Sequence, residues 1–126
     1  MKALNIIGTA YRATLEEQDD PVVWITHAMA GACANLDVLL RGNAVNYAVL
    51  GQDASGLAFG ERRQKHAPRL ADDLAGLIDK GVAVYVVEDD LDERGLEENT
   101  LIKGLRPVPR DGIARLIDGY DQVWHW

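Results

Sequence analysis

The sequence predicts a three-layer α/β sandwich built on a mostly parallel five-stranded sheet. Short apolar runs recur along the chain, and helical patterns of about ten to twenty residues separate them, which is typical of βαβ units. The length of 126 residues and the apolar content of 48% fit one domain that spans residues 1–126. The chain shows no internal repeat or linker.

The amino-terminal half predicts two strands with one long helix between them. Residues 3–8 form a short apolar run closed by a glycine, which is typical of a buried strand. Asp20 followed by Pro21 gives an acidic N-cap and a proline at the first helical position, where a missing N–H costs nothing. Apolar residues then recur every three or four positions until a basic residue and a glycine end the pattern. We therefore expect a helix over residues 21–41 and a second strand over residues 45–50.

The middle of the chain predicts a loop, a helix and the central strand. Glycines leave the loop over residues 52–60 little intrinsic stiffness. A helical pattern follows over residues 61–80, in which Pro68 either introduces a kink or marks the true first turn. Residues 82–87 form an unbroken run of β-branched and aromatic residues. This run is the clearest strand of the chain, and we expect it at the centre of the sheet.

The carboxyl-terminal part predicts two more strands around a short helix. The strand over residues 105–108 contains Pro107, which cannot donate a backbone hydrogen bond, so we expect it near an edge of the sheet. A helix over residues 109–118 and a last strand over residues 122–126 complete the chain. Trp124 and Trp126 share one face of that strand, and we expect them either to close the core or to form a subunit interface.

Composition and charge exclude several classes of protein. The net charge is −7 and the pI is about 4.8, so direct binding to nucleic acid is not expected. No window is apolar enough to cross a bilayer, and the first residues do not resemble a signal peptide. We therefore expect a cytoplasmic protein with no membrane association.

One cysteine and three scattered histidines argue against a metal centre. A lone thiol forms neither an internal disulfide nor a four-cysteine zinc site. The histidines, at positions 27, 66 and 125, lack any metal-ligand spacing, and we expect neither a metal nor a cofactor. Cys33 lies within the predicted first helix between Met29 and Leu36, where a thiol is more often packed than reactive.

The charge of the chain is concentrated in one segment. Residues 88–98 hold seven acids and one base, which gives −6 of the total of −7. The segment does not match the calcium-binding EF-hand pattern, and we expect a solvated connection. Residues 62–66 are the one basic cluster. It is either a solvated helix start or a surface that mates with the acidic segment of a second copy.

A ligand pocket is expected at the carboxyl ends of the strands, as in other open α/β sheets. The predicted loops at that edge are residues 9–12, 52–55 and 88–90. The candidate ligand-binding residues in them are Thr9, Tyr11, Arg12, Gln52, Asp53 and Glu88. None of these loops carries a glycine-rich phosphate motif, so a nucleotide-binding flavodoxin-like domain is not expected.

The second half of the chain contains the segment VYVVEDDLDERGL over residues 84–96 and ends on a tryptophan-bearing strand. With these features it resembles the DsrE/DsrF/DsrH family of small sulfur-relay proteins, which are related to the TusBCD proteins, and it is most similar to the DsrH and TusB branch. The longer amino-terminal half, with Gly8-Thr9-Ala10-Tyr11, is closer to DsrE.

The resemblance implies an oligomeric α/β domain, often a trimer or hexamer or a hetero-oligomer of related subunits. Active members carry persulfide sulfur on a cysteine, and a sulfur-carrier protein is then a partner. In the DsrE and DsrF branches this cysteine ends the third strand, but the matching position here is Val87. In the DsrH branch a cysteine lies in the first helix, where this chain has Cys33.

Three hypotheses follow from these observations. The chain is a family member of intracellular sulfur metabolism without the strand-end cysteine, and acts as a structural or binding subunit. Alternatively, Cys33 is a catalytic thiol that accepts and passes on a persulfide, so that the protein is at most a sulfurtransferase. This hypothesis predicts a partly exposed Cys33 near a cation such as Arg12 or Arg41. The third hypothesis is a domain that binds a small ligand at the strand ends.

Overall fold

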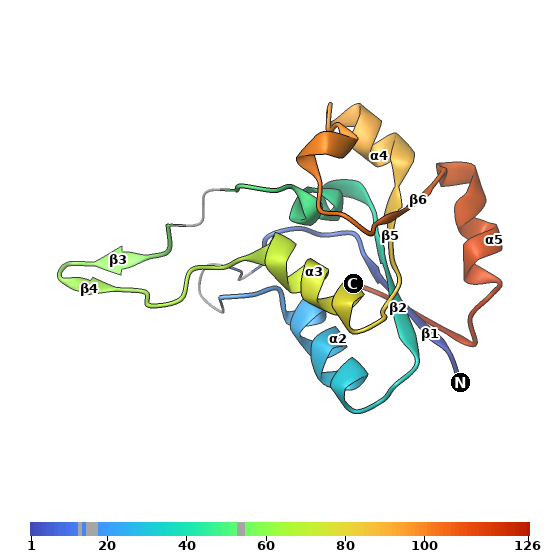
Figure 1. Cartoon of the computed structure of the whole chain (residues 1–126), viewed down its shortest axis with the longest axis horizontal. Coiled ribbons are helices and arrows are strands. Elements are labelled where there is room, and N and C mark those ends of the chain that lie inside the picture. The colour runs from blue at the N-terminus through green and yellow to red at the C-terminus, as the bar shows by residue number, and fades with distance from the viewer. Residues whose placement is uncertain (13, 15–17, 53–54) are drawn as a thin grey trace.

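The computed structural model describes residues 1–12, 14, 18–52 and 55–126 (Figure 1). Five strands form one sheet in the order β6-β5-β2-β1-β7, and every pairing in it is parallel. The prediction of a mostly parallel five-stranded sheet is confirmed. The strands are β1 (Ala3–Ile7), β2 (Leu36–Leu40), β5 (Val84–Val87), β6 (Arg106–Val108) and β7 (Gln122–His125).

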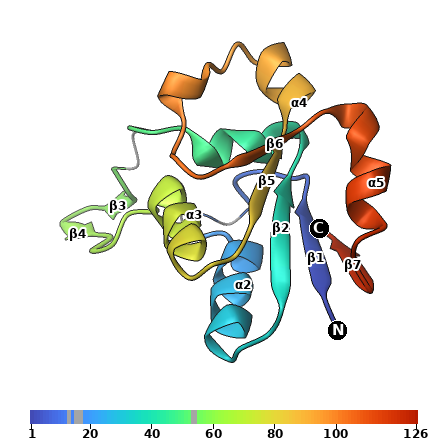
Figure 2. The ribbon, with the colours of Figure 1, turned by 45° about the vertical axis from the view of Figure 1, so that its right-hand side comes forward.

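Helices cover both faces of the sheet, as the predicted sandwich requires (Figure 2). On one face α2 (Pro21–Gly31) and α3 (Leu70–Asp79) enclose the larger hydrophobic core, whose largest fully buried side chain is Tyr47. On the other face α5 (Ile113–Ile117) packs on a smaller core that includes Leu4 and Val87. Short helical segments supply the connections: η1 (Gly42–Ala48), α4 (Glu88–Glu93), η2 (Glu98–Thr100) and η3 (Arg110–Gly112).

The predicted helix over residues 21–41 is wrong in its second half. Asp20 caps α2 as expected, since its side chain accepts hydrogen bonds from the N–H groups of Val22 and Val23 at 2.8 and 3.1 Å. The helix ends at Gly31, however, and the sequence LDVLL forms strand β2. Its side chains are buried throughout, so this short run satisfies a helical pattern and a buried parallel strand equally well.

The predicted strand over residues 45–50 is also wrong, because these residues belong mostly to η1. The helical segment follows β2 directly and buries its apolar residues against the larger core. Since β2 already occupies the place beside β1, no sheet edge is available there for another strand. The apolar residues of this segment are therefore buried in the core without forming a strand.

The predicted helix over residues 61–80 begins late. Its first residues form an antiparallel hairpin of β3 (Ala58–Phe59) and β4 (Arg62–Arg63), and α3 starts only after the buried Pro68. Gly60 has φ of 60° and is the first residue of a two-residue turn, a place that favours glycine. The hairpin projects well away from the sheet (Figure 1).

The strand predicted over residues 82–87 is β5, but its predicted place at the centre of the sheet is wrong, because β5 lies next to the edge strand β6 and β2 is the central strand. The elements that follow it are confirmed. Strand β6 lies at one edge of the sheet, as its proline predicts, and α5 and β7 follow in the predicted order. Strand β7 forms the opposite edge and pairs with β1, with Trp124 beside Asn5 and His125 beside Ile6. Neighbouring residues of a strand face opposite sides of a sheet, so Trp124 and His125 point to different faces.

Candidate functional site

The carboxyl ends of the five parallel strands meet at one edge of the sheet, where the chain turns into α4 and the neighbouring loops (Figure 2). Thr9, Tyr11 and Arg12 follow β1 at this edge, and Glu88 follows β5. Gln52 comes after η1, and its side chain accepts a hydrogen bond of 2.7 Å from the Tyr11 hydroxyl. Of the candidate ligand-binding residues, Asp53 lies outside the residues that the structure describes. Ligand binding by the others stays a prediction.

Tyr47 is the centre of a buried relay of hydrogen bonds beneath this edge. Its hydroxyl donates to a carboxylate oxygen of Asp20 at 2.7 Å and accepts the backbone N–H of Tyr11 at 2.6 Å. The two tyrosine rings meet edge to face, with centroids 5.3 Å apart. Burial and the hydrogen bond to Asp20 raise the pKa of Tyr47 well above its usual value. Tyr47 therefore stays protonated and fixes the loop after β1 to α2.

Tyr11 itself is held in an uncommon conformation. Its φ is 60°, in the left-handed region that non-glycine residues rarely occupy, and its side chain is half-exposed. The hydrogen bonds to Tyr47 and Gln52 hold it there. Left-handed residues of this kind cluster at functional sites, and Tyr11 stays a candidate ligand-binding residue at the strand ends.

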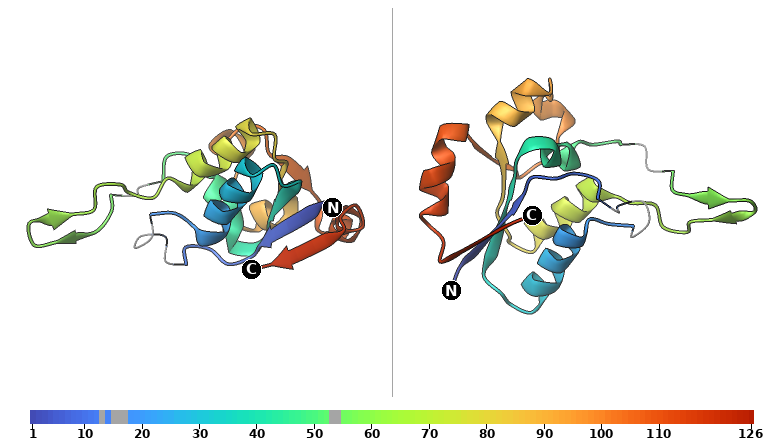
Figure 3. Two further views of the ribbon diagram at one scale, coloured as in Figure 1. Left: turned by 90° about the horizontal axis from the view of Figure 1, so that it is seen from below. Right: turned by 180° about the vertical axis from the view of Figure 1, so that it is seen from behind.

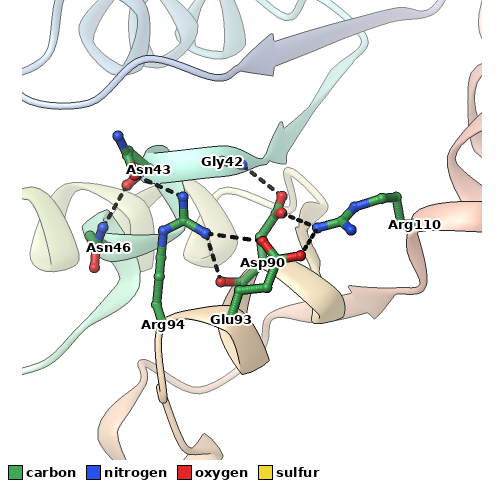
Figure 4. A network of polar contacts seen from close by, with 7 residues as sticks. All are labelled: Gly42, Asn43, Asn46, Asp90, Glu93, Arg94 and Arg110. Atoms are coloured by element: carbon green, nitrogen blue, oxygen red, sulfur yellow. Dashed lines mark hydrogen bonds and ion pairs between the residues drawn. The ribbon is translucent and has the colours of Figure 1, made fainter.

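A network of charged side chains centres on Asp90 and joins the ends of β2 and β6 to α4 (Figure 4). One carboxylate oxygen of Asp90 accepts the backbone N–H of Gly42 at 2.7 Å, and the other accepts Nη2 of Arg110 at 2.7 Å. Burial by itself raises the pKa of this carboxyl group, but the hydrogen bonds from Gly42 and Arg110 and the nearby positive charge outweigh it. The pKa of Asp90 therefore lies below its usual value, and the group is ionised at neutral pH.

Arg94 and Arg110 extend the network on either side of Asp90. Arg94 donates to the Asp90 carbonyl at 3.0 Å and to the side-chain oxygen of Asn43 at 2.8 Å. Arg110 also pairs with Glu93 at 2.7 Å, and its backbone N–H donates to Asp89. The acidic segment is therefore not simply a solvated connection, because three of its carboxylates bind Arg110. Sequence reasoning missed this network, since its partners are distant in the chain.

A groove lies beside this network, between α4, η2 and the β5–β6 edge, with a cavity volume of about 910 Å³. Its apolar lining includes Leu50, Leu96 and Leu105, and three acidic residues also line it, Glu88, Asp92 and Glu98. Lys103 is the basic residue among the lining residues. Of the predicted ligand-binding residues that the structure describes, Glu88 alone lines this groove.

Cys33 is exposed, so the prediction that it packs in the core is wrong. It lies in the turn between α2 and β2, with φ of 65°, because the helix ends sooner than the apolar pattern suggests. This turn is at the amino ends of the strands, whereas Arg12 and Arg41 follow the carboxyl ends of β1 and β2. The structure therefore does not bring Cys33 together with these two cations.

In the DsrE and DsrF branches that the sequence resembles, the sulfur-carrying cysteine ends the third strand. In this chain a buried aliphatic side chain occupies that position. Val87 is the last residue of β5, is 1% exposed and belongs to the smaller core. Glu88, the next residue, is exposed at the start of α4. The single cysteine of the chain, Cys33, lies in the turn after α2 and not at this strand end.

The histidines do not gather at one place. His27 joins α2 to α3, with Nε2 2.7 Å from the Asp73 carbonyl and Nδ1 3.0 Å from the Lys80 ammonium. His125 lies on the edge strand β7. Within the described ranges, no three or more histidine, cysteine or acidic residues cluster in a way that could hold a metal ion. None of the helices in the described part of the chain has the length and apolar character needed to cross a membrane.

Comparisons with known proteins identify the fold. No protein-family model matches the chain, and no curated protein matches its sequence. The crystal structure of the YchN protein from E. coli is similar over the whole of both chains, with a TM-score of 0.73 and 18% identity. The structure of MTH1491 from Methanobacterium thermoautotrophicum, a protein of unknown function, is also similar, with a TM-score of 0.67 and 12% identity. The match covers 99% of this chain and 98% of the MTH1491 chain. Both are DsrE-like fold proteins, and the likeness shows that fold for this chain.

Proposed function

We propose that this chain is a cytoplasmic DsrE-like protein of intracellular sulfur metabolism that carries no sulfur itself and acts as a structural or binding subunit. The observation that carries this proposal is that the Cys33 thiol lies far from the carboxyl ends of the strands. The position expected to hold the sulfur is the buried Val87, and the single thiol lies at the opposite edge of the sheet.

The chemistry of persulfide transfer explains why the place of the thiol matters for function. A carrier thiol must ionise, attack the outer sulfur of a donor persulfide and later be attacked by an acceptor. Such a thiol is activated by a cation or a helix N-terminus. Cys33 instead follows the carboxyl end of α2, where the helix dipole is negative. Cys33 therefore lies at the opposite end of the helix from the one that activates a thiol.

The binding role is assigned to the strand carboxyl ends. Tyr11 and Gln52 present polar side chains there, and Glu88 lies at the end of the neighbouring β5. Small ligands of open α/β sheets bind beyond this edge. An oligomer, either of this chain as a trimer or hexamer or with related subunits, and contact with a sulfur-carrier protein are part of the same proposal.

The second candidate function is a persulfide carrier that uses Cys33, and the exposure of the thiol favours it. In this reaction the Cys33 thiolate attacks the outer sulfur of a donor persulfide, R–S–SH. The donor S–S bond breaks, the donor leaves as the thiolate RS⁻, and Cys33 becomes Cys–S–SH. An exposed thiol is sterically open to such a donor.

Sulfur uptake measured against a plain thiol distinguishes the two candidates. The native protein is incubated with glutathione persulfide, and the added sulfur is followed by mass spectrometry, with the urea-unfolded chain as reference and C33S as control. For a non-carrier we expect the native rate to lie within about threefold of the unfolded rate at equal pH. A native rate more than about tenfold higher would overturn the proposal in favour of the carrier, because only an activated thiolate reacts so fast.

A further inference from the structure

The hairpin of β3 and β4 is an arm that leaves the body of the protein. We define the arm as residues 57–64, and it extends away from the sheet and its helices (Figures 1 and 3). All four strand residues are exposed. Phe59, beside the turn, has 74% of its surface exposed.

An arm of this kind is not stable by itself in water. Two strands of two residues each bury almost nothing, and isolated two-stranded hairpins are marginal at best. Its ends are joined by the N–H of Gln64 donating to the Leu57 carbonyl at 2.8 Å and by the Gln64 side chain accepting the N–H of Leu57. An exposed phenylalanine on such an arm is typical of a contact surface.

The groove beside α4 complements the arm in both polarity and charge. The arm presents one aromatic ring next to Arg62 and Arg63. The groove offers leucine side chains for the ring and, within the same lining, Glu88, Asp92 and Glu98. Its volume of about 910 Å³ is sufficient for a phenylalanine side chain. Opposite charges placed around an apolar contact direct a partner and fix its register.

The arm points away from α4 and does not lie in the groove of its own chain (Figure 1). We propose that the arm of one copy docks in the groove of a second copy. Phe59 inserts between Leu50, Leu96 and Leu105, and Arg62 and Arg63 pair with Glu88, Asp92 and Glu98. Each copy then gives one arm and receives one, as in a reciprocal dimer or a head-to-tail ring.

This docking bears on the candidate site. Glu88 lies both in the groove and at the carboxyl end of β5, so the incoming arm forms one wall of the space next to the strand ends. The partner copy thereby completes the site. The proposal does not depend on whether Cys33 carries sulfur, and the sulfur-uptake experiment is independent of it.

Charge reversal tests the pairing, with mass measured by size-exclusion chromatography and light scattering. We expect the wild type to run as a multiple of 13.8 kDa. R62E/R63E and D92K/E98K should each run as a monomer, and the chain carrying all four changes should reassemble. The matched control R69E/R115E makes the same charge change at exposed positions outside the arm and should assemble as the wild type does. A monomeric wild type, or assembly unaffected by either reversal, would overturn the proposal.

Cross-linking tests the register in a C33S background. A sample of F59C mixed with L50C should form an intermolecular disulfide under mild oxidation, at least about tenfold more than F59C mixed with A114C, whose new thiol is exposed on α5 on the other face of the sheet. Equal cross-linking of F59C to both partners would contradict docking in the groove, even if the protein is an oligomer by another surface.

Discussion

The Asp90 network and the arm both gather charged side chains, but the two regions use them in opposite ways. In the network, Arg110 lies 2.7 Å from both Asp90 and Glu93, and Asp90 is 7% exposed (Figure 4). In the arm, Arg62 and Arg63 are exposed and form no ion pair within the part of the chain that the structure describes. Charges satisfied within one chain stabilise its fold, whereas charges displayed on a projecting hairpin are available to a partner. The predictions below test this division.

The largest effect is expected from D90A. The substitution leaves the Gly42 N–H without its acceptor and removes the buried partner of Arg110, so we expect a loss of about 2–4 kcal/mol in the free energy of unfolding. Urea denaturation measures it. E97A removes an exposed acid that lies outside the network and outside the groove lining, and this matched control should stay within about 0.5 kcal/mol of the wild type. A loss below about 1 kcal/mol for D90A would show that the network does not hold α4.

A smaller effect is expected from Y47F. The ring remains, but the hydroxyl that donates to Asp20 and accepts from Tyr11 is lost. We expect a cost of about 1–2 kcal/mol by urea denaturation. Y85F removes the hydroxyl of another tyrosine, the half-buried Tyr85 of β5, and serves as the comparison. Its loss in the free energy of unfolding should be smaller. Equal costs would indicate that the relay to Asp20 adds nothing to stability.

The contribution of Asp90 to the free energy of unfolding should decrease as the pH falls. Its pKa is lowered in the folded protein, so near this pKa the unfolded chain binds more protons and stability falls as the pH falls. The contribution is complete above the unfolded value of about 3.9 and is lost as the pH passes through the lower folded value. The difference in unfolding free energy between the wild type and D90N should therefore shrink below about pH 4. A difference that grows on acidification would contradict the assigned shift.

The smallest effect is expected from the arm. At concentrations where the chain is monomeric, R62E/R63E should change the free energy of unfolding by less than about 0.5 kcal/mol, because exposed charges without a partner contribute little. At higher concentrations the wild type should gain stability and the variant should not, since assembly stabilises the folded state. Thermal unfolding over a range of protein concentrations measures both. A loss above about 1 kcal/mol in the monomer would place these arginines among the residues that hold the fold.

The parts of the fold that the sequence predicted correctly rest on local signals. Strand β1 is marked by a short apolar run, the start of α2 by Asp20 and Pro21, and the edge position of β6 by its proline. The hairpin also had a local signal, the Gly60-Glu61 turn between Phe59 and Arg62, but the helical pattern that follows obscured it.

The candidate site was predictable only in part. The expectation that loops after the strands share one edge places Tyr11 and Glu88 correctly at the carboxyl ends of β1 and β5. The Asp90 network was not predictable, because Gly42, Asp90 and Arg110 are far apart in the chain and no spacing marks them. Strand order was not predictable for the same reason, since it depends on pairing between strands that are far apart in the chain.

The sequence by itself determined the α/β class, the cap of α2, the last three strands, and the absence of a thiol at Val87. Each of these depends on neighbouring residues or on composition. Tertiary structure alone decided that residues 36–40 form a strand, that Cys33 is exposed, and that Arg110 is bound while Arg62 and Arg63 face solvent. A short run buried on both faces carries no period, and an ion pair is fixed by distance in space, so only the folded chain specifies them.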